Sequence, residues 1–210
     1  MSVLGRIAHF QDRRDEVPNQ ELAHDLASRQ DRRGIKEIAD NLWNQEKDIQ
    51  ADCIKVLYEV GYIDPALVAE HAEDFVKLLK SRNNRLVWGG MIALGTVAAL
   101  KADVVFAHIE DIQQAMKTGS VITVDNAVVV LARAASTSDR YRKAIFPLLI
   151  GHLKTCRPKD VPQHSEKTLP AVNPSNRKDF VAVLTKRMGD LSGSGLARVK
   201  KVIKQAQARN

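Results

Sequence analysis

The feature of this sequence that most constrains its fold is an internal repeat with a period of 37 residues. Leu57, Leu94 and Leu131 are separated by this period, and each follows a small residue at the same offset, namely Cys53, Gly90 and Ala127. Ala72, Phe75 and Leu79 follow Leu57 in the same unit. The residues one period before them, Ile35, Ile38 and Leu42, are also apolar and mark a weaker first unit. Self-similarity at a fixed period of this length indicates a stack of about four units.

Each unit is predicted to contain two helices, because apolar residues recur twice at helical spacing within it, first at Ile54, Leu57, Tyr58 and Gly61 and then at Val68, Ala72, Phe75 and Leu79. Asp64 is expected to cap the second helix and Pro65 to begin it, and Asp139 is expected to cap the equivalent helix of the fourth unit. With 5% aromatic residues and no alternation of period two, we expect no strands. The predicted helices cover residues 18–29, 34–44, 47–61, 65–81, 84–99, 102–117, 121–136 and 139–155.

The pattern of these units resembles the HEAT-repeat (armadillo-like) family of α-solenoids. The resemblance covers roughly residues 18–155 and is carried by the helix cores 54–57, 92–95 and 129–132 and by the helix ends 75–79 and 148–153. It implies an all-α, right-handed α-solenoid of helical hairpins, with the second helices lining a concave face. The turn proline that is frequent in the family appears only at Pro65, and its common Asp/Arg ladder is not regular here.

A different region follows the repeats. Four of the seven prolines lie within residues 157–176, which predicts a long irregular connection with at most a short helix near residues 163–169. Beyond it, apolar residues at helical spacing predict a basic hairpin over 177–210 that caps the open end of the stack; a separately mobile arm is the alternative. We therefore divide the chain into a polar segment (1–17), the repeat stack (18–156), the connection (157–176) and the C-terminal cap (177–210).

Composition favours a cytoplasmic protein. Its two cysteines, Cys53 and Cys156, lie far apart and form neither a disulfide framework nor a metal-binding spacing. No run of 18 apolar residues occurs, and residues 1–20 lack the apolar run of a secretory signal. We expect no membrane association, and a monomer is the favoured oligomeric state.

Matching polar residues point to a partner-binding face. His71, Glu73 and Asp74 recur one period later as His108, Glu110 and Asp111, which places histidines and carboxylates in register on stacked second helices. Such a set can bind a divalent metal, but a polar ladder between repeats is the favoured interpretation, so we expect no metal and no cofactor. An acidic face of this kind favours basic partner segments. The residues predicted to bind a partner are Glu70, His71, Asp74, His108, Asp111 and Gln114.

The net charge of +7 is concentrated near the C-terminus. Residues 154–210 hold thirteen lysines and arginines against four acidic residues, whereas residues 1–153 hold nineteen against twenty-one. Nucleic-acid binding through phosphate contacts is therefore an alternative function, although no base-reading module or aromatic stacking platform accompanies the charge. The residues that would make these contacts are Arg177, Lys178, Lys186, Arg187, Arg198, Lys200, Lys201 and Lys204.

Catalysis has no positive support in the sequence. Hydrolase, nucleotide-binding and zinc-protease motifs are all absent, and no catalytic residue is predicted. Some HEAT-like proteins are glycosylases for alkylated DNA bases and use aromatic side chains in the groove; Trp88 is better interpreted as a packing or partner contact. We therefore expect a non-catalytic scaffold that binds a protein or peptide on its concave surface, with nucleic-acid binding, as a HEAT-like DNA glycosylase or otherwise, as the alternative.

Overall fold

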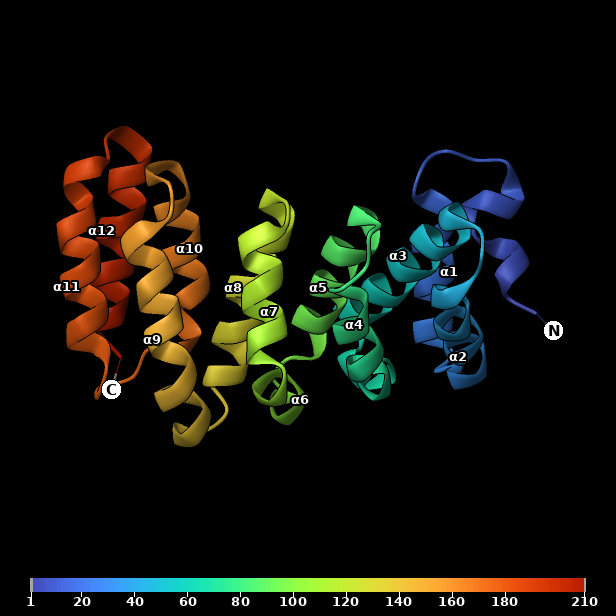
Figure 1. Cartoon of the computed structure of the whole chain (residues 1–210), viewed down its shortest axis with the longest axis horizontal. Helices are drawn as coiled ribbons and strands as arrows, with labels where there is room; N and C mark the ends of the chain where they lie inside the picture. The colour runs from blue at the N-terminus through green and yellow to red at the C-terminus, as the bar shows by residue number, and fades with distance from the viewer. Residues whose placement is uncertain (1, 210) are drawn as a thin grey trace. The chain divides into compact units, whose positions relative to one another are not determined.

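The structure, a computed structural model, describes residues 2–209, and within this range it contains helices and no strand (Figure 1). None of the helices in this range is long and apolar enough to cross a membrane. By its contacts the chain separates into two compact units, Met1–Ala127 and Val128–Asn210, and each is described by itself.

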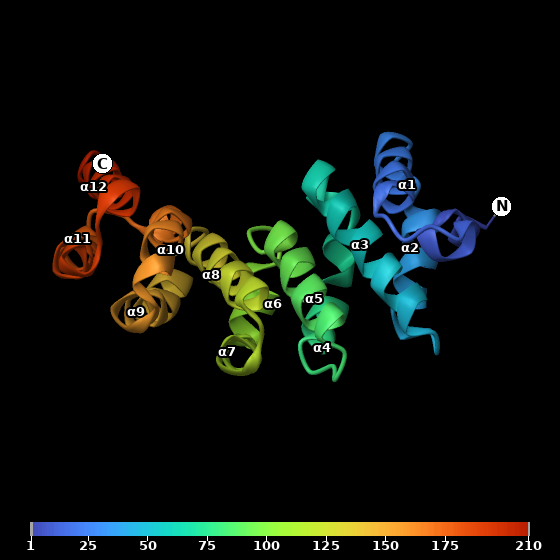
Figure 2. The ribbon, with the colours of Figure 1, turned by 90° about the horizontal axis from the view of Figure 1, so that it is seen from above.

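The first unit is built from paired helices. Its members are α1 (Val17–Ser28), α2 (Arg32–Asp40), α3 (Lys47–Ile63), α4 (Ala72–Leu78), α5 (Asn84–Val97), α6 (Ala102–Ala107), α7 (Ile109–Thr118) and the start of α8 (Val121–Ala135). Helices α1, α3 and α5 pack side by side in one row, α2 packs on α3, and α4 packs on α5 (Figure 2). The first helices of the first three hairpins, α1, α3 and α5, therefore contact one another in chain order.

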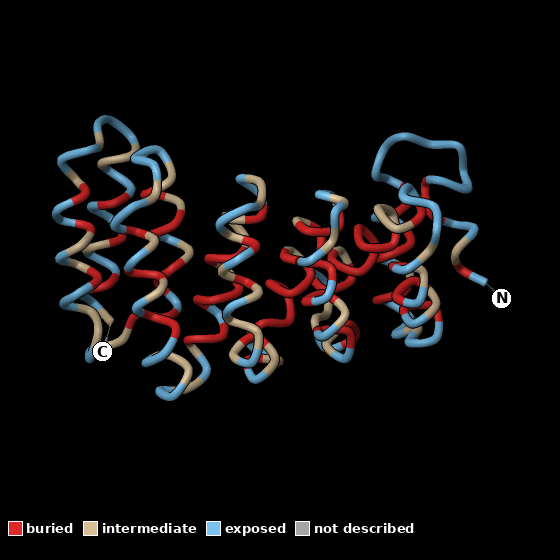
Figure 3. Tube along the Cα trace, viewed as in Figure 1, coloured by how far each residue is buried: buried red, intermediate tan, exposed pale blue. Residues whose placement is uncertain are grey.

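The aligned leucines occupy the same kind of environment. Leu57 and Leu94 are completely buried in the first unit, and Leu131 is buried in the second. In Figure 3 the buried positions lie where helices face one another, and the outward surfaces are exposed. Gly90, four residues before Leu94, lies at a close approach of two helices: a Cβ atom there would stand 2.9 Å from both the Phe75 carbonyl oxygen and the Leu78 Cβ. The absence of a side chain lets α5 approach α4 closely.

Two predicted second helices are broken, contrary to expectation. The range 65–81 holds 3₁₀ turns at Pro65–Leu67 and Ala69–His71 before α4, because Val68 (φ −115°, ψ 0°) leaves the helical region. The range 102–117 is divided into α6 and α7 at His108 (φ −114°, ψ 27°). Both pieces still present their apolar residues to the core, so the apolar pattern runs through the break and does not reveal it.

The second unit is also built from packed helices. It contains the rest of α8, then α9 (Asp139–Thr155), α10 (Val161–Thr168), α11 (Arg177–Arg187) and α12 (Gly193–Gln207). Helix α10 packs against α9 and α12, and α11 packs against α9 and α12. The proline-rich range 157–176 thus holds a packed helix, in which Pro162 lies in the first turn, where a missing N–H costs little.

The caps of the second helices were predicted with mixed success. Asp64 accepts a hydrogen bond from the Ala66 N–H at 3.0 Å, as expected for a capping residue, with Pro65 following it. The prediction for Asp139 is wrong, because Ser138 caps α9 by accepting from the Tyr141 N–H at 3.2 Å. Serine and aspartate are equally good caps, so two adjacent candidates could not be separated by residue type.

Candidate functional site

A polar ladder joins α4 and α7 in the first unit. His71 and His108 stand immediately before these helices, and Asp74 and Asp111 lie in their first turns. The His108 Nδ1 is 3.1 Å from Asp111 Oδ2, and the corresponding His71 Nδ1 is 3.7 Å from Asp74 Oδ2. The same local arrangement therefore recurs after one period, which places the two histidines in register as the repeat predicts.

The ladder continues from one hairpin to the next. His108 Nε2 lies 3.1 Å from Glu73 Oε2, and Lys80 Nζ lies 2.9 Å from Asp111 Oδ1. The Lys80 ammonium, together with the hydrogen bond from His108, lowers the pKa of the Asp111 carboxyl, against the opposing effect of burial. These contacts link the α7 hairpin to the α4 hairpin through charged and polar groups.

The ladder ends at His71. Its Nε2 atom is buried and has no hydrogen-bond partner. One period before Glu73, which bonds His108, the sequence has Lys36, and Lys36 pairs with Asp40 instead. The first hairpin therefore provides no carboxylate for His71, consistent with its weaker repeat pattern.

The predicted partner-binding residues differ in how accessible they are. Glu70 and Gln114 are exposed, Asp74, His108 and Asp111 are half-buried, and His71 is buried. Exposed carboxylates on the same helices include Glu73 and Glu110, one period apart. Beside them lies a hollow of about 530 Å³, lined by residues that include Lys80, Arg82, Asp111 and Gln114. The face thus offers exposed acids beside half-buried polar groups, of which His108 and Asp111 already contact each other and the preceding hairpin.

A second hollow of the first unit, of about 540 Å³, lies against α3 and α5. Tyr58 and Trp88 line it, with their ring centroids 6.5 Å apart, and Lys55 lies with its Nζ 4.9 Å from the Tyr58 centroid. The ammonium of Lys55 also pairs with Glu16 and Glu59, at 2.7 Å from each. Trp88 is half-buried and makes the packing contact expected of it, while part of its surface remains accessible.

The basic residues predicted to contact nucleic acid fall into two groups: arginines with partners inside the protein and exposed lysines. Arg177 donates to the carbonyl oxygens of Gln207 and Arg209, Arg198 pairs with Glu166, and Arg187 is buried and donates to two carbonyl oxygens at the end of α9. These three arginines hold the second unit together. The remaining five predicted residues are exposed lysines, namely Lys178, Lys186, Lys200, Lys201 and Lys204.

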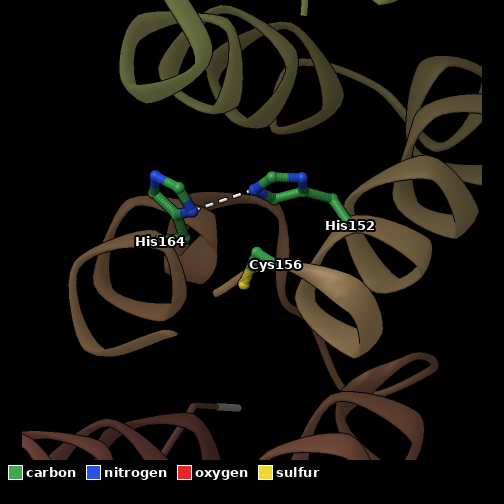
Figure 4. A group of neighbouring side chains, drawn as sticks. All are labelled: His152, Cys156 and His164. Atoms are coloured by element: carbon green, nitrogen blue, oxygen red, sulfur yellow. Dashed lines mark hydrogen bonds between the residues drawn. The ribbon is translucent and has the colours of Figure 1, made fainter. Parts of the chain in front are cut away.

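The fold also brings together three potential metal ligands that the sequence analysis did not connect. His152, Cys156 and His164 each offer one ligand atom, and these atoms lie within 4.8 Å of one another (Figure 4). His152 lies in the last turn of α9, and Cys156, four residues later, directly follows that helix. His164 lies in the short helix expected near residues 163–169, but nothing in the sequence indicated its contact with α9.

Comparison with known proteins identifies the fold. No protein-family model matches the sequence, and no curated protein sequence matches it. Two crystal structures of engineered proteins from the Northeast Structural Genomics Consortium are similar, with TM-scores of 0.66 and 0.68 at 18% and 17% identity, over 99% of this chain and 98% and 100% of theirs. A designed armadillo repeat protein in complex with the peptide (KR)4 has a TM-score of 0.65 at 11% identity, over 90% of this chain and 85% of its own. These likenesses confirm the predicted all-α helical-repeat fold.

Proposed function

We propose that this chain is a non-catalytic scaffold that binds an extended, basic segment of a partner protein. The binding surface, called the α4–α7 face, is the surface around Glu70, Glu73, Asp74, Glu110 and Asp111. The observation that carries the proposal is the repeated acidic surface: Glu73 and Glu110 are exposed one period apart, and Glu70 is exposed beside them. Helical repeats of equal period present equal groups at regular intervals, which suits a partner whose charges also recur along an extended chain.

The charge arrangement supports a basic partner. Glu70 and Glu73 have 62% and 55% of their side-chain surface exposed, whereas Asp74 and Asp111 have 29% and 26% and are held by Lys77 and Lys80. The exposed glutamates can accept lysine or arginine from a partner without breaking an ion pair with lysine or arginine; Glu73 contacts His108, and Glu70 lies 4.0 Å from His71. The designed armadillo protein similar to this chain is bound to a peptide of alternating lysine and arginine, which makes that peptide a suitable first probe.

Charge reversal on this face is expected to abolish binding of a basic peptide. We expect Asp74→Lys/Asp111→Lys to reduce the affinity for a labelled peptide of alternating lysine and arginine by at least about tenfold, because each change places a cation beside the bound cations. Fluorescence anisotropy measures the affinity, and affinity capture from a lysate, with nuclease treatment, measures the set of protein partners.

Two further variants make this test specific. Glu70→Lys/Glu110→Lys reverses exposed carboxylates outside the His108–Glu73 and Lys80–Asp111 contacts, so its effect does not depend on breaking the contacts between hairpins; Glu70 itself lies 4.0 Å from His71. Glu46→Lys/Asp179→Lys changes the net charge by the same amount at exposed sites on α11 and before α3, and it should bind like the parent protein. Equal affinity in the parent and both α4–α7 variants, or an unchanged set of captured partners, would reject this face as the binding site.

Nucleic-acid binding is the second candidate, favoured by the five exposed lysines of α11 and α12. If they contact phosphates, the logarithm of the affinity for duplex or single-stranded DNA should fall with the logarithm of salt concentration by about 0.7–0.9 per contact. Lys200→Gln/Lys201→Gln/Lys204→Gln should then reduce this slope by about 2–3. Affinity that is independent of salt, or a slope that the triple variant leaves unchanged, would contradict phosphate binding by these residues.

A further inference from the structure

His152, Cys156 and His164 belong to the second unit and are not among the residues of either proposed surface. His152 lies in the last turn of α9, Cys156 directly follows that helix, and His164 lies in α10. Figure 4 shows the two imidazoles directed toward one another across the α9–α10 contact, with Cys156 beside them. The His152 Nε2 and His164 Nδ1 are 2.9 Å apart, and the three ligand atoms all lie within 4.8 Å of one another.

We propose that His152, Cys156 and His164 form a binding site for a divalent cation of the zinc class. Zn²⁺ is borderline-soft and binds imidazole nitrogen and cysteine sulfur, at about 2.0–2.1 and 2.3 Å. A tetrahedral site with these bond lengths separates two nitrogens by about 3.4 Å and a nitrogen from a sulfur by about 3.6 Å. The distance from His152 Nε2 to His164 Nδ1, 2.9 Å, is shorter than the first value, and the other separations are at most 4.8 Å, so rotations of the side chains would bring the ligand atoms to these distances.

The backbone that carries the ligands is held firmly. Arg187 donates to the carbonyl oxygen of Cys156 at 2.8 Å and to that of Leu153 at 2.6 Å, which fixes the end of α9. In α10, Thr168 Oγ1 donates to the carbonyl oxygen of His164 at 2.8 Å, and the His164 side chain is almost completely buried. A site with few ways to rearrange loses less conformational freedom when a metal binds.

The electrostatic surroundings permit a cation. The nearby cationic groups of Arg187 and Arg157 are paired with Asp190 and Asp160, each at 2.6 Å. Cysteine binds zinc as a thiolate, so the loss of its proton supplies one negative charge to the site. His152 and Cys156 are half-buried, which leaves room for a water molecule as the fourth ligand.

The proposal predicts one zinc ion per chain. Equilibrium dialysis of the full chain with Zn²⁺ should give a stoichiometry of one, and Co²⁺ should produce the absorption of thiolate-to-cobalt charge transfer. Cys156→Ser should remove that absorption, and His164→Gln should lower the affinity for Zn²⁺ by at least about 100-fold, beyond what the loss of an outer-shell group costs. His24→Gln, at an exposed histidine of the first unit, is the matched control and should bind like the parent protein.

Alkylation provides a readout in the unaltered chain. Bound Zn²⁺ should slow the reaction of Cys156 with iodoacetamide by at least about tenfold because the thiolate is coordinated. Cys53, completely buried in the first unit, reports whether the protein has unfolded. Unprotected Cys156 at saturating Zn²⁺, the absence of charge-transfer absorption, or equal zinc binding by the parent and His164→Gln would overturn the proposal and leave an interhelical His–His hydrogen bond only.

Discussion

Replacing Leu94 by alanine is expected to destabilise the first unit by about 2–5 kcal/mol. Leu94 is completely buried in α5, at the position that recurs in each hairpin, and α5 packs against both α3 and α4. The substitution removes apolar contacts and leaves a cavity between three helices, which neighbours in regular helices can fill only partly. A repeat unit has no core independent of its neighbours, so the loss acts on the whole first unit.

The measurement can be made specific to that unit. Both tryptophans, Trp43 and Trp88, belong to residues 1–127, so urea unfolding followed by tryptophan fluorescence reports the first unit. Leu100→Ala is the matched control, because Leu100 lies only six residues further on and is 55% exposed. We expect it to change the unfolding free energy by less than about 0.5 kcal/mol. Similar effects of the two substitutions would contradict a buried repeat position at Leu94.

The repeat could be predicted from the sequence because packing between hairpins requires apolar residues at the same position of each unit. Each hairpin must bury its stripe against a neighbour, so Leu57, Leu94 and Leu131 had to recur at one spacing. The breaks at Val68 and His108 were not predictable, because a backbone can leave the helical region and re-enter it while its apolar residues still face the core. The sequence therefore predicts which face of a helix is buried better than it predicts where the helix begins or ends.

Contacts between residues close in sequence, or related by the repeat period, could be predicted for the candidate sites. Other contacts between residues of different hairpins could not. The register of His71 and His108 follows directly from the period, but the ion pair between Lys80 and Asp111 joins different hairpins and required the structure. The metal-ligand group could be anticipated only at His152 and Cys156, which are four residues apart where α9 ends. His164 lies in α10, which overlaps the short helix expected near residues 163–169, but its approach to α9 joins two separate elements and required the structure.

Counting charges along the sequence could not show which individual cations are exposed to a partner and which are used inside the protein. It located the excess of cations at the C-terminus, yet exposed and buried cations contribute equally to a count. Among the residues that the structure describes, Lys186 and Arg187 are adjacent in sequence but differ completely in environment, since Lys186 is exposed and Arg187 is buried. Whether a cation serves the fold or an external partner is decided by the acceptors that surround it.

Arg187→Met is accordingly expected to destabilise the second unit by about 3–5 kcal/mol, the range for breaking a buried charge interaction. The guanidinium donates to the carbonyl oxygens of Leu153 and Cys156 and pairs with Asp190 at 2.6 Å, so its removal leaves two acceptors at the end of α9 without their donor. Asp190 is 47% exposed and can be hydrated, which moves the expected loss toward the lower end of the range.

A pair of neighbouring controls separates this structural role from phosphate binding. Lys186→Met removes an exposed cation and should leave the unfolding free energy within about 0.5 kcal/mol, whereas Arg187→Lys should lie between the parent and Arg187→Met because an ammonium lacks the planar fork that reaches two carbonyls. Both tryptophans lie in the first unit, so hydrogen exchange of the α9 amides provides the measurement for the second. If Arg187→Met keeps full protection of α9 and instead reduces the salt dependence of DNA binding, Arg187 acts on an external phosphate and its role at the end of α9 is dispensable.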